Sequence, residues 1–160
     1  MSTGFEIANS TVTDNTADED TDGFGDGGGI FINSGESAEL RNSIVADNHD
    51  SSSSPQAPDC AGTLQSGGYN LIGSLGVPLA VCTIVGDSTG NLVGADPLLD
   101  VLADNYGPTE THALGPGSAA INAGDPAGWM RRMRPLSART ARASYTAWRE
   151  TLAISSRTAW

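Results

Sequence analysis

Short segments that alternate apolar and polar residues recur along the first two thirds of the chain. The run IANSTVTDN from Ile7 returns as LRNSIVADN from Leu40, 33 residues later. Within the second run, Leu40 and Ile44 share one parity, which places them on one face of a strand. A shorter run, YNLIG from Tyr69, returns as GNLVG from Gly90 after 21 residues. The pattern predicts short strands bounded by Asn and Gly.

The spacing of these runs predicts stacked units with insertions between them. Aligning Ile44 with Ile72 links the two pairs of runs through a spacing of 28. If 21 residues are the minimal unit, the longer spacings contain insertions, which we place at Thr16–Gly28 and His49–Pro58. Repeats on this scale mark units that cannot bury their apolar faces alone. The predicted fold is therefore all-β, a short right-handed parallel β-helix of four or five coils over residues 5–127. A β-sandwich is the alternative, but it would need hairpins and would show no such register.

Asparagine recurs at fixed places in the repeat. Asn9 aligns with Asn42, and Asn15 with Asn48. Stacked Asn amides can hydrogen-bond along the stack, and Asn tolerates left-handed backbone at corners. We therefore expect these residues to be structural.

The two cysteines, Cys60 and Cys82, are 22 residues apart, close to one minimal repeat. That spacing places them on neighbouring coils within reach of a disulfide. The register favours a disulfide over two free thiols, and a disulfide would indicate an oxidising compartment.

Charge is distributed very unevenly along the chain. The formal net charge is −11, yet residues 1–129 hold 18 of the 19 acidic groups and a single basic one, Arg41. An acidic body repels nucleic acid and anionic membranes, so electrostatics argue against both as partners of residues 1–129. No apolar run of about 18 residues exists, so we expect no transmembrane span.

Composition changes abruptly at Trp129, which divides the chain into residues 1–128 and a tail, residues 129–160. The tail holds seven arginines and one acid, and it contains neither Asn nor Gly. It could be a basic amphipathic segment for an anionic surface, a helix that caps the solenoid, or the product of a shifted reading frame. We favour the third interpretation and expect such residues to look helical. The chain also enters a repeat directly, without a signal-peptide pattern, so we expect a fragment of a longer protein.

Several runs together resemble a known family. They are GGGIFINSG, LRNSIVADN, DCAGTLQSGGYNLIG, TGNLVGADPLLDVLADNYGPTETHAL and PGSAAINAGDP. Over residues 5–127 the chain resembles the right-handed parallel β-helix domain of bacterial choice-of-anchor Q surface proteins, which are related to polymorphic outer-membrane protein repeats. The resemblance implies a pectin-lyase-like solenoid that is secreted or attached to the bacterial cell surface, in a family whose members mostly have no established enzymatic activity. The sequence departs from the family after AGDP, which supports the shifted reading frame.

One acidic segment has the residue types of a calcium loop. Asp18, Asp20, Asp22 and Asp26 match the first, third, fifth and ninth positions of an EF-hand loop. The twelfth position, which needs a bidentate Glu, is Gly29, so an EF-hand is excluded. A looser Ca²⁺ site stays open, and a solvated acidic insertion is the favoured interpretation. We expect no other cofactor.

A second set of residues could serve catalysis. The repeat places Asp14 and Asp47 on adjacent coils, where two carboxyl groups could act as acid and base in glycoside hydrolysis. A polysaccharide lyase would instead need a base, for which Arg41 is the candidate. Both aspartates precede Asn in a turn, where Asp is expected for local hydrogen bonding, so structural roles are favoured.

The sequence thus predicts a non-catalytic module, either a stalk or an adhesin-like passenger. A rigid solenoid that projects loops suits glycan or surface-protein partners. The alternative is a carbohydrate-active enzyme, a polysaccharide lyase or glycoside hydrolase, on the same fold.

Overall fold

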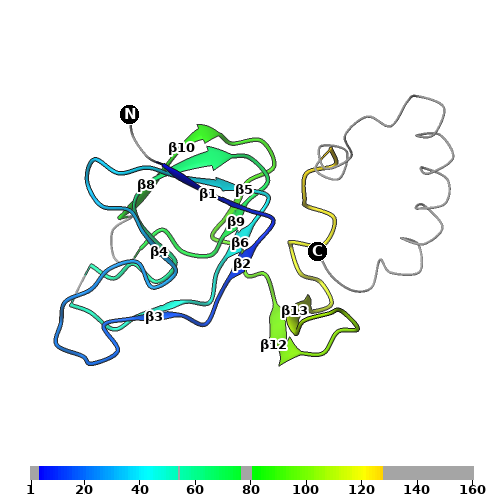
Figure 1. Ribbon diagram of the computed structural model, residues 1–160, viewed down its shortest axis with the longest axis horizontal. Coiled ribbons are helices and arrows are strands. Elements are labelled where there is room, and N and C mark those ends of the chain that lie inside the picture. Colours follow the sequence, from blue (N-terminus) through cyan, green and yellow to red (C-terminus); the bar gives the residue numbers. More distant parts are fainter. Residues whose placement is uncertain (1–3, 54, 77–80, 128–160) are drawn as a thin grey trace, which may run out of the picture. The chain divides into compact units, whose positions relative to one another are not determined.

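The computed structural model describes residues 4–53, 55–76 and 81–127, and over these residues the fold is all-β, with no helix (Figure 1). The strands are β1 (Phe5–Ala8), β2 (Thr11–Val12), β3 (Thr16–Ala17), β4 (Ile30–Phe31), β5 (Ala38–Arg41), β6 (Ile44–Val45), β7 (His49–Asp50), β8 (Cys60–Gly67), β9 (Leu71–Ile72), β10 (Cys82–Asp87), β11 (Leu92–Val93), β12 (Leu99–Ala103) and β13 (Thr111–Leu114). The described residues form two compact units. The first comprises residues 4–97 and 119–125, and the second comprises residues 98–118 and 126–127.

Two parallel sheets organise the first unit. One has the strand order β1-β5-β8-β10, with β4 paired to the start of β8, and the other has the order β11-β9-β6-β2. Neighbouring strands in each sheet come from successive repeats. The remainder of each repeat forms the crossover connection that two parallel strands require. The prediction of an all-β fold with parallel strands is confirmed. The sheets do not close into a solenoid over the described residues, so the β-helix itself stays a prediction.

The register differs by one residue from the predicted alignment of Ile44 with Ile72. Ile44 pairs with Leu71, and Val45 pairs with Ile72. A shift of one residue normally exchanges the buried and exposed faces of a strand. Here β6 and β9 are two residues long and buried at both positions, so the apolar pattern could not choose between the two alignments.

The two insertions begin later than the repeat pattern predicts. Thr16–Ala17 and His49–Asp50 pair as the parallel strands β3 and β7, so the extra segments start only at Asp18 and Ser51. At their far ends the segments run together again, where the Gly28 amide donates to the Ala57 carbonyl at 3.1 Å. Backbone hydrogen bonds thus join the two insertions to each other at both ends.

The core lies between the two main sheets and is most complete in the middle repeats. Leu40, Val45, Leu64 and Ile72 are fully buried. The equivalent apolar residues of the first repeat, such as Ile7, are only partly buried because β1 and β2 are edge strands. Burial of aliphatic side chains is the main source of stability in such a stack.

Cys60 and Cys82 form a disulfide, with their Cα atoms 5.4 Å apart. Cys60 begins β8 and Cys82 begins β10, which are neighbours in the first sheet. Both residues belong to the buried core cluster. The disulfide therefore links the third repeat to the fourth from inside the core.

The second unit is a small antiparallel hairpin of β12 and β13, with an irregular register between Leu99 and Leu102 (Figure 1). In the first unit, residues 119–125 form turns and bends and contain no strand. The tail, residues 129–160, lies outside the described residues, so its interpretations remain predictions. The part of the chain that the structure describes contains no helix long and apolar enough to span a membrane.

Candidate functional site

In each of the four repeats of the first unit, the residue at an equivalent turn has a left-handed backbone conformation, and we call these residues the corner column. Asn9, Asn42, Tyr69 and Gly90 occupy it, with φ values of 52°, 49°, 58° and 66°. The Asn42 side-chain amide donates to the Asn9 Oδ1 at 2.7 Å. Asparagine and glycine suit this backbone conformation, which explains two of the recurrent asparagines as turn residues.

The next residue in each repeat forms a second column, which sequence reasoning missed. The backbone amide of each residue donates to the side-chain oxygen of its equivalent in the following repeat. The distances are 3.1 Å from Ser10 to Ser43, 3.2 Å from Ser43 to Asn70 and 2.9 Å from Asn70 to Asn91. The signal was present in the sequence as a Ser or Asn after every corner residue. This ladder fixes the register of the repeats.

A buried carboxylate completes a third column. Asn15 donates from its side chain to the Asn48 Oδ1 at 2.9 Å. Asn48 in turn donates from its backbone and side-chain amides to the Asp59 Oδ1, at 3.1 and 2.9 Å. Asp59 is buried, and no sequence pattern distinguished it from the other aspartates. These polar groups satisfy one another, so the column is structural.

The structure places Asp14 and Asp47 at equivalent left-handed corners on neighbouring repeats, with φ values of 57° and 59°. The Asp14 amide donates to the Asp47 carbonyl at 3.3 Å. Although Asp47 is exposed overall, partial desolvation of its carboxyl raises its pKa, and the negative charges of Asp96, Asp59 and Asp14 raise it further. The geometry fits the turn role that the sequence favours.

Arg41 is not paired with either of these aspartates. It lies on β5, and its guanidinium forms an ion pair with Glu6 on β1, in which Nε donates to the Glu6 Oε1 at 3.0 Å. Asp14 and Asp47 follow strands of the other sheet. The structure therefore brings the two aspartates together on neighbouring repeats but places Arg41 with Glu6.

We expect Asp47→Asn to stabilise the protein at neutral pH. The raised pKa of Asp47 means that its ionised carboxylate is less favourable in the folded state than in the unfolded chain. The associated stability is complete below the unfolded pKa and is lost as pH rises through the folded pKa. Asn stays neutral and tolerates the same left-handed backbone, so the gain at pH 7 and low salt should be about 0.5 kcal/mol, a value typical of screened surface charges.

Urea unfolding of the variant and the parent at neutral and acidic pH measures this gain. The difference should shrink in acid, where Asp47 is protonated in the parent, and in high salt, which screens the repulsion. Asp14→Asn is the matched control, because Asp14 makes the smallest of the three charge contributions and should yield a smaller gain. A loss of stability in Asp47→Asn at neutral pH would contradict the assignment.

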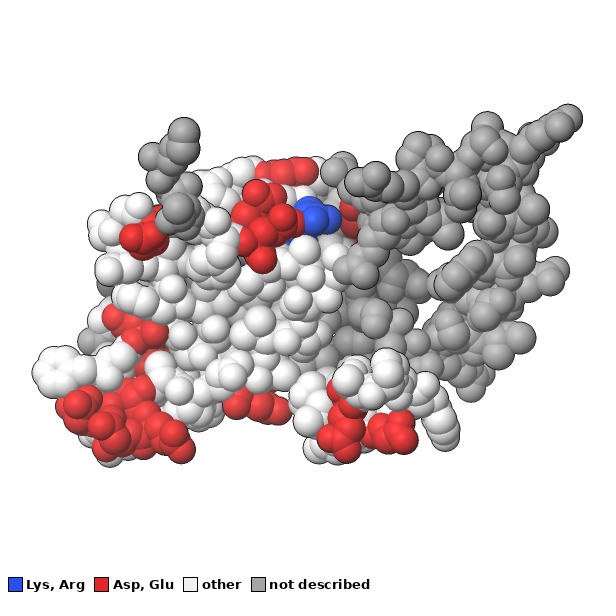
Figure 2. All heavy atoms as spheres, in the orientation of Figure 1, with Lys and Arg blue, Asp and Glu red and all other residues white. Residues whose placement is uncertain are grey.

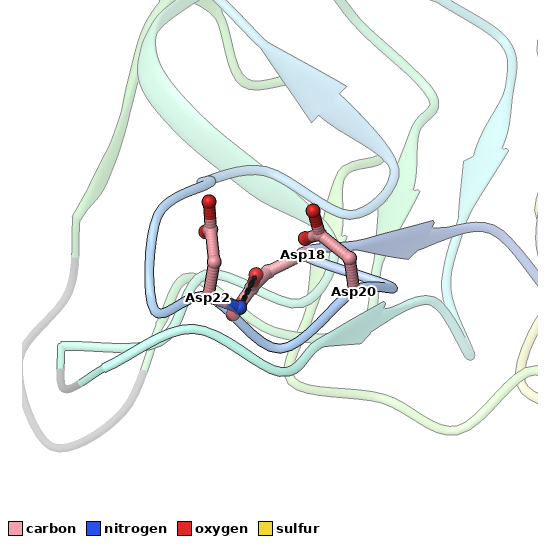
Figure 3. Close-up of side chains that lie close together, drawn as sticks. All are labelled: Asp18, Asp20 and Asp22. Atoms are coloured by element: carbon pink, nitrogen blue, oxygen red, sulfur yellow. Dashed lines mark hydrogen bonds between the residues drawn. The ribbon is translucent and has the colours of Figure 1, made fainter.

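The acidic loop brings three of the four calcium candidates together. Asp18, Asp20 and Asp22 each offer an oxygen, and these atoms all lie within 4.8 Å of one another, whereas Asp26 lies outside the group. Asp20 and Asp22 point their carboxylates to one side of the loop, and Asp18 turns toward the Asp22 amide (Figure 3).

Asp18 already has a structural role in this loop. Its Oδ1 accepts the Asp22 amide at 2.9 Å, and its Oδ2 accepts the Gly23 amide at 3.1 Å. Desolvation raises the pKa of Asp18, and the neighbouring Asp22 carboxylate raises it further, against the lowering effect of the two amides. Calcium needs six to eight oxygen ligands. The three carboxylates are ligands of the right type. With one oxygen from each, as the group is arranged, backbone carbonyls or waters would have to supply the remaining ligands.

The charged side chains of the described residues are predominantly acidic. Figure 2 shows groups of acidic side chains on the visible face, with one basic side chain among them. Arg41 is the sole Lys or Arg among the described residues. Such a surface disfavours anionic ligands and suits neutral or cationic ones.

Comparisons with protein-family models, with curated proteins and with solved structures found no match to this chain. The residues and geometry of the chain itself are therefore the basis for assigning a function.

Proposed function

We propose that the chain is a non-catalytic, secreted or cell-surface module built on a short right-handed parallel β-helix. The support for the β-helix is that both main sheets add one parallel strand per repeat, in register with a side-chain ladder across four repeats. The resemblance to the choice-of-anchor Q domain points the same way. Such a rod would project its loops toward a glycan or a surface protein.

One observation carries the non-catalytic assignment: the candidate catalytic groups already serve the scaffold. Asp14 and Asp47 form left-handed corners. Arg41, the candidate lyase base, is held in an ion pair with Glu6. A guanidinium held in an ion pair is poorly placed to take a proton from a substrate, and aspartates at such corners are explained by the turn itself.

The buried disulfide supports the proposed location. Disulfides persist in oxidising compartments, which include the bacterial periplasm and the cell exterior. Cys60 and Cys82 are both in the core, where their pairing stabilises the fold.

A carbohydrate-active enzyme is the second candidate, and the raised pKa of Asp47 favours it. A general acid in glycoside hydrolysis must stay protonated, and the stacked Asp14 would be its partner. Arg41, the sole basic side chain of the Lys or Arg type among the described residues, pairs with Glu6 instead, which argues against the lyase form of the alternative.

Incubation with acidic and neutral polysaccharides, followed by reducing-end and unsaturated-sugar assays, separates the two functions. We expect no turnover from the parent, and the same background from Asp14→Asn and Asp47→Asn. Turnover that disappears in either variant would establish the enzyme instead. Binding of the parent to an immobilised glycan or surface protein, without turnover, is the positive result that the proposal requires.

A further inference from the structure

One column of apolar side chains crosses the first sheet from edge to edge. Phe5 on β1 pairs with Ala38, and Ile84 on β10 pairs with Leu64. Ala38 and Leu64 pair with each other, so the four residues follow one another across the sheet. The two inner residues are 1% exposed, whereas Phe5 is 55% exposed and Ile84 is only partly buried. The column is therefore buried in the middle and incompletely covered at both ends.

A second apolar column crosses the other sheet in the same way. Val12 on β2 pairs with Val45, and Val93 on β11 pairs with Ile72. Val45 and Ile72 pair with each other and have no exposed surface. At the ends of the column, Val93 is 48% exposed and Val12 is only partly buried. Each end residue packs against one neighbouring repeat, where the inner residues pack against two.

The strands at these ends also point backbone groups out of the sheets. Over the described residues, β1 and β2 are the edge strands at one end, and β10 and β11 are the edge strands at the other. The carbonyls on either side of Thr11 accept amides of the second repeat, so by alternation the Thr11 backbone groups point away from β6. The amides on either side of Val93 donate to carbonyls of the third repeat, so the Val93 groups point away from β9. Both edges can therefore accept a further parallel strand.

We propose that the chain associates head to tail with a second copy of itself, with β10 and β11 of one copy pairing in parallel with β1 and β2 of the next. Carried one repeat further, the register places Ile84 beside Phe5 of the next copy and Val93 beside Val12 of the next copy. Both sheets then continue across the same contact, which extends the interface that already joins successive repeats within the chain. The inference rests on the sheets alone and does not depend on the proposed function.

Net charge and the side-chain ladder make this association weak and reversible. The formal net charge of −11 makes two copies repel each other, and salt screens this repulsion. The ladder does not extend into the next copy, because the Asn91 amide donates to the Ser88 carbonyl at 3.1 Å. The apolar columns and the strand pairing are left to join the copies. We therefore expect association to increase with protein concentration and with salt.

Sedimentation velocity of the full chain at neutral pH tests the head-to-tail contact. Such a contact joins two different surfaces and leaves one of each free, so it does not close at a dimer. We expect the mean mass to rise continuously with protein concentration, to pass that of a dimer, and to rise further in high salt. A monomer at every concentration, or a mass that stops at the dimer, would overturn the proposal.

Proline substitutions test the two edges separately. Thr11→Pro and Val93→Pro each remove an amide that points out of a sheet, a position at which an edge strand tolerates proline. Each variant alone should be a monomer, because it keeps only one kind of edge. Their equimolar mixture should form a dimer and nothing larger. A mixture no heavier than its components, with both variants folded by thermal unfolding, would refute the contact, as would self-association of Val93→Pro alone.

A charge placed in the first column tests the predicted apolar contact. Phe5→Asp should raise the protein concentration needed for association at least about tenfold, because it buries a carboxylate against Ile84 of the neighbouring copy without a partner. Phe31→Asp is the matched control, since Phe31 is 54% exposed and belongs to neither column. Association of the control should match that of the parent. An equal effect of the two substitutions, or no effect of Phe5→Asp, would exclude this contact.

Discussion

Replacing Asn70 by alanine should lower the free energy of unfolding by about 3 kcal/mol. Asn70 is 1% exposed, at the centre of the side-chain ladder. Its Oδ1 accepts the Ser43 amide at 3.2 Å, and its Nδ2 donates to the Leu40 carbonyl at 2.9 Å. Alanine removes the buried acceptor of the Ser43 amide and one buried donor to the Leu40 carbonyl, and each lost buried partner costs about 1–3 kcal/mol.

Urea unfolding of Asn70→Ala against the parent measures this cost. Asn91→Ala is the matched control, because Asn91 occupies the last position of the same ladder and is only partly buried. Water can replace its hydrogen bonds, so the control should lose about 1 kcal/mol or less. Similar losses in the two variants would show that burial within the ladder does not set the cost, and would contradict the prediction.

Removing the disulfide should have an effect of similar size. The double variant Cys60→Ala, Cys82→Ala is expected to lose about 3 kcal/mol, because the disulfide closes a loop with a sequence separation of 22 and restricts the unfolded chain. Both side chains also lie in the core cluster, so their truncation removes packing between β8 and β10. The loss should appear as a lower unfolding midpoint in denaturant.

Reduction provides the matched comparison for the disulfide. Treating the parent with a thiol reductant under partly denaturing conditions breaks the cross-link but keeps both cysteine side chains in place. The reduced parent should therefore lie between the oxidised parent and the double variant, and the reductant should not affect the double variant. A reduced parent as stable as the oxidised one would rule out a stabilising role for the cross-link.

The disulfide and the side-chain ladder differ greatly in how visible they are in the sequence. The cysteine pairing follows from a single spacing, because one repeat carries the chain to the neighbouring strand. The Ser43–Asn70 hydrogen bond was hidden because Ser and Asn are different residue types and the spacing of 27 is not that of the flanking repeats. The ladder became recognisable only when the register was known.

The candidate catalytic and metal-binding residues were likewise recognised from the sequence by residue type, whereas their partners became known only from the structure. The sequence identified Asp14, Asp47 and Arg41 by residue type, but it could not show that Arg41 pairs with Glu6. It grouped Asp26 with Asp18, Asp20 and Asp22, whereas the structure brings only the latter three together. Charges close in sequence need not converge, because the loop backbone sets the direction of each side chain.

By itself, the sequence determined that the part of the chain that the structure describes is built from short strands that recur as a repeat, and that the first 129 residues are acidic. Those properties follow from local periodicity and composition, which any fold of this chain must satisfy. Tertiary structure alone decided the one-residue register of β6 and β9, the burial of Asp59 and the exposure of Tyr106 at a left-handed corner. Each of these depends on contacts between residues far apart in the chain, or on the backbone conformation of a single turn, and neither is fixed by the local pattern.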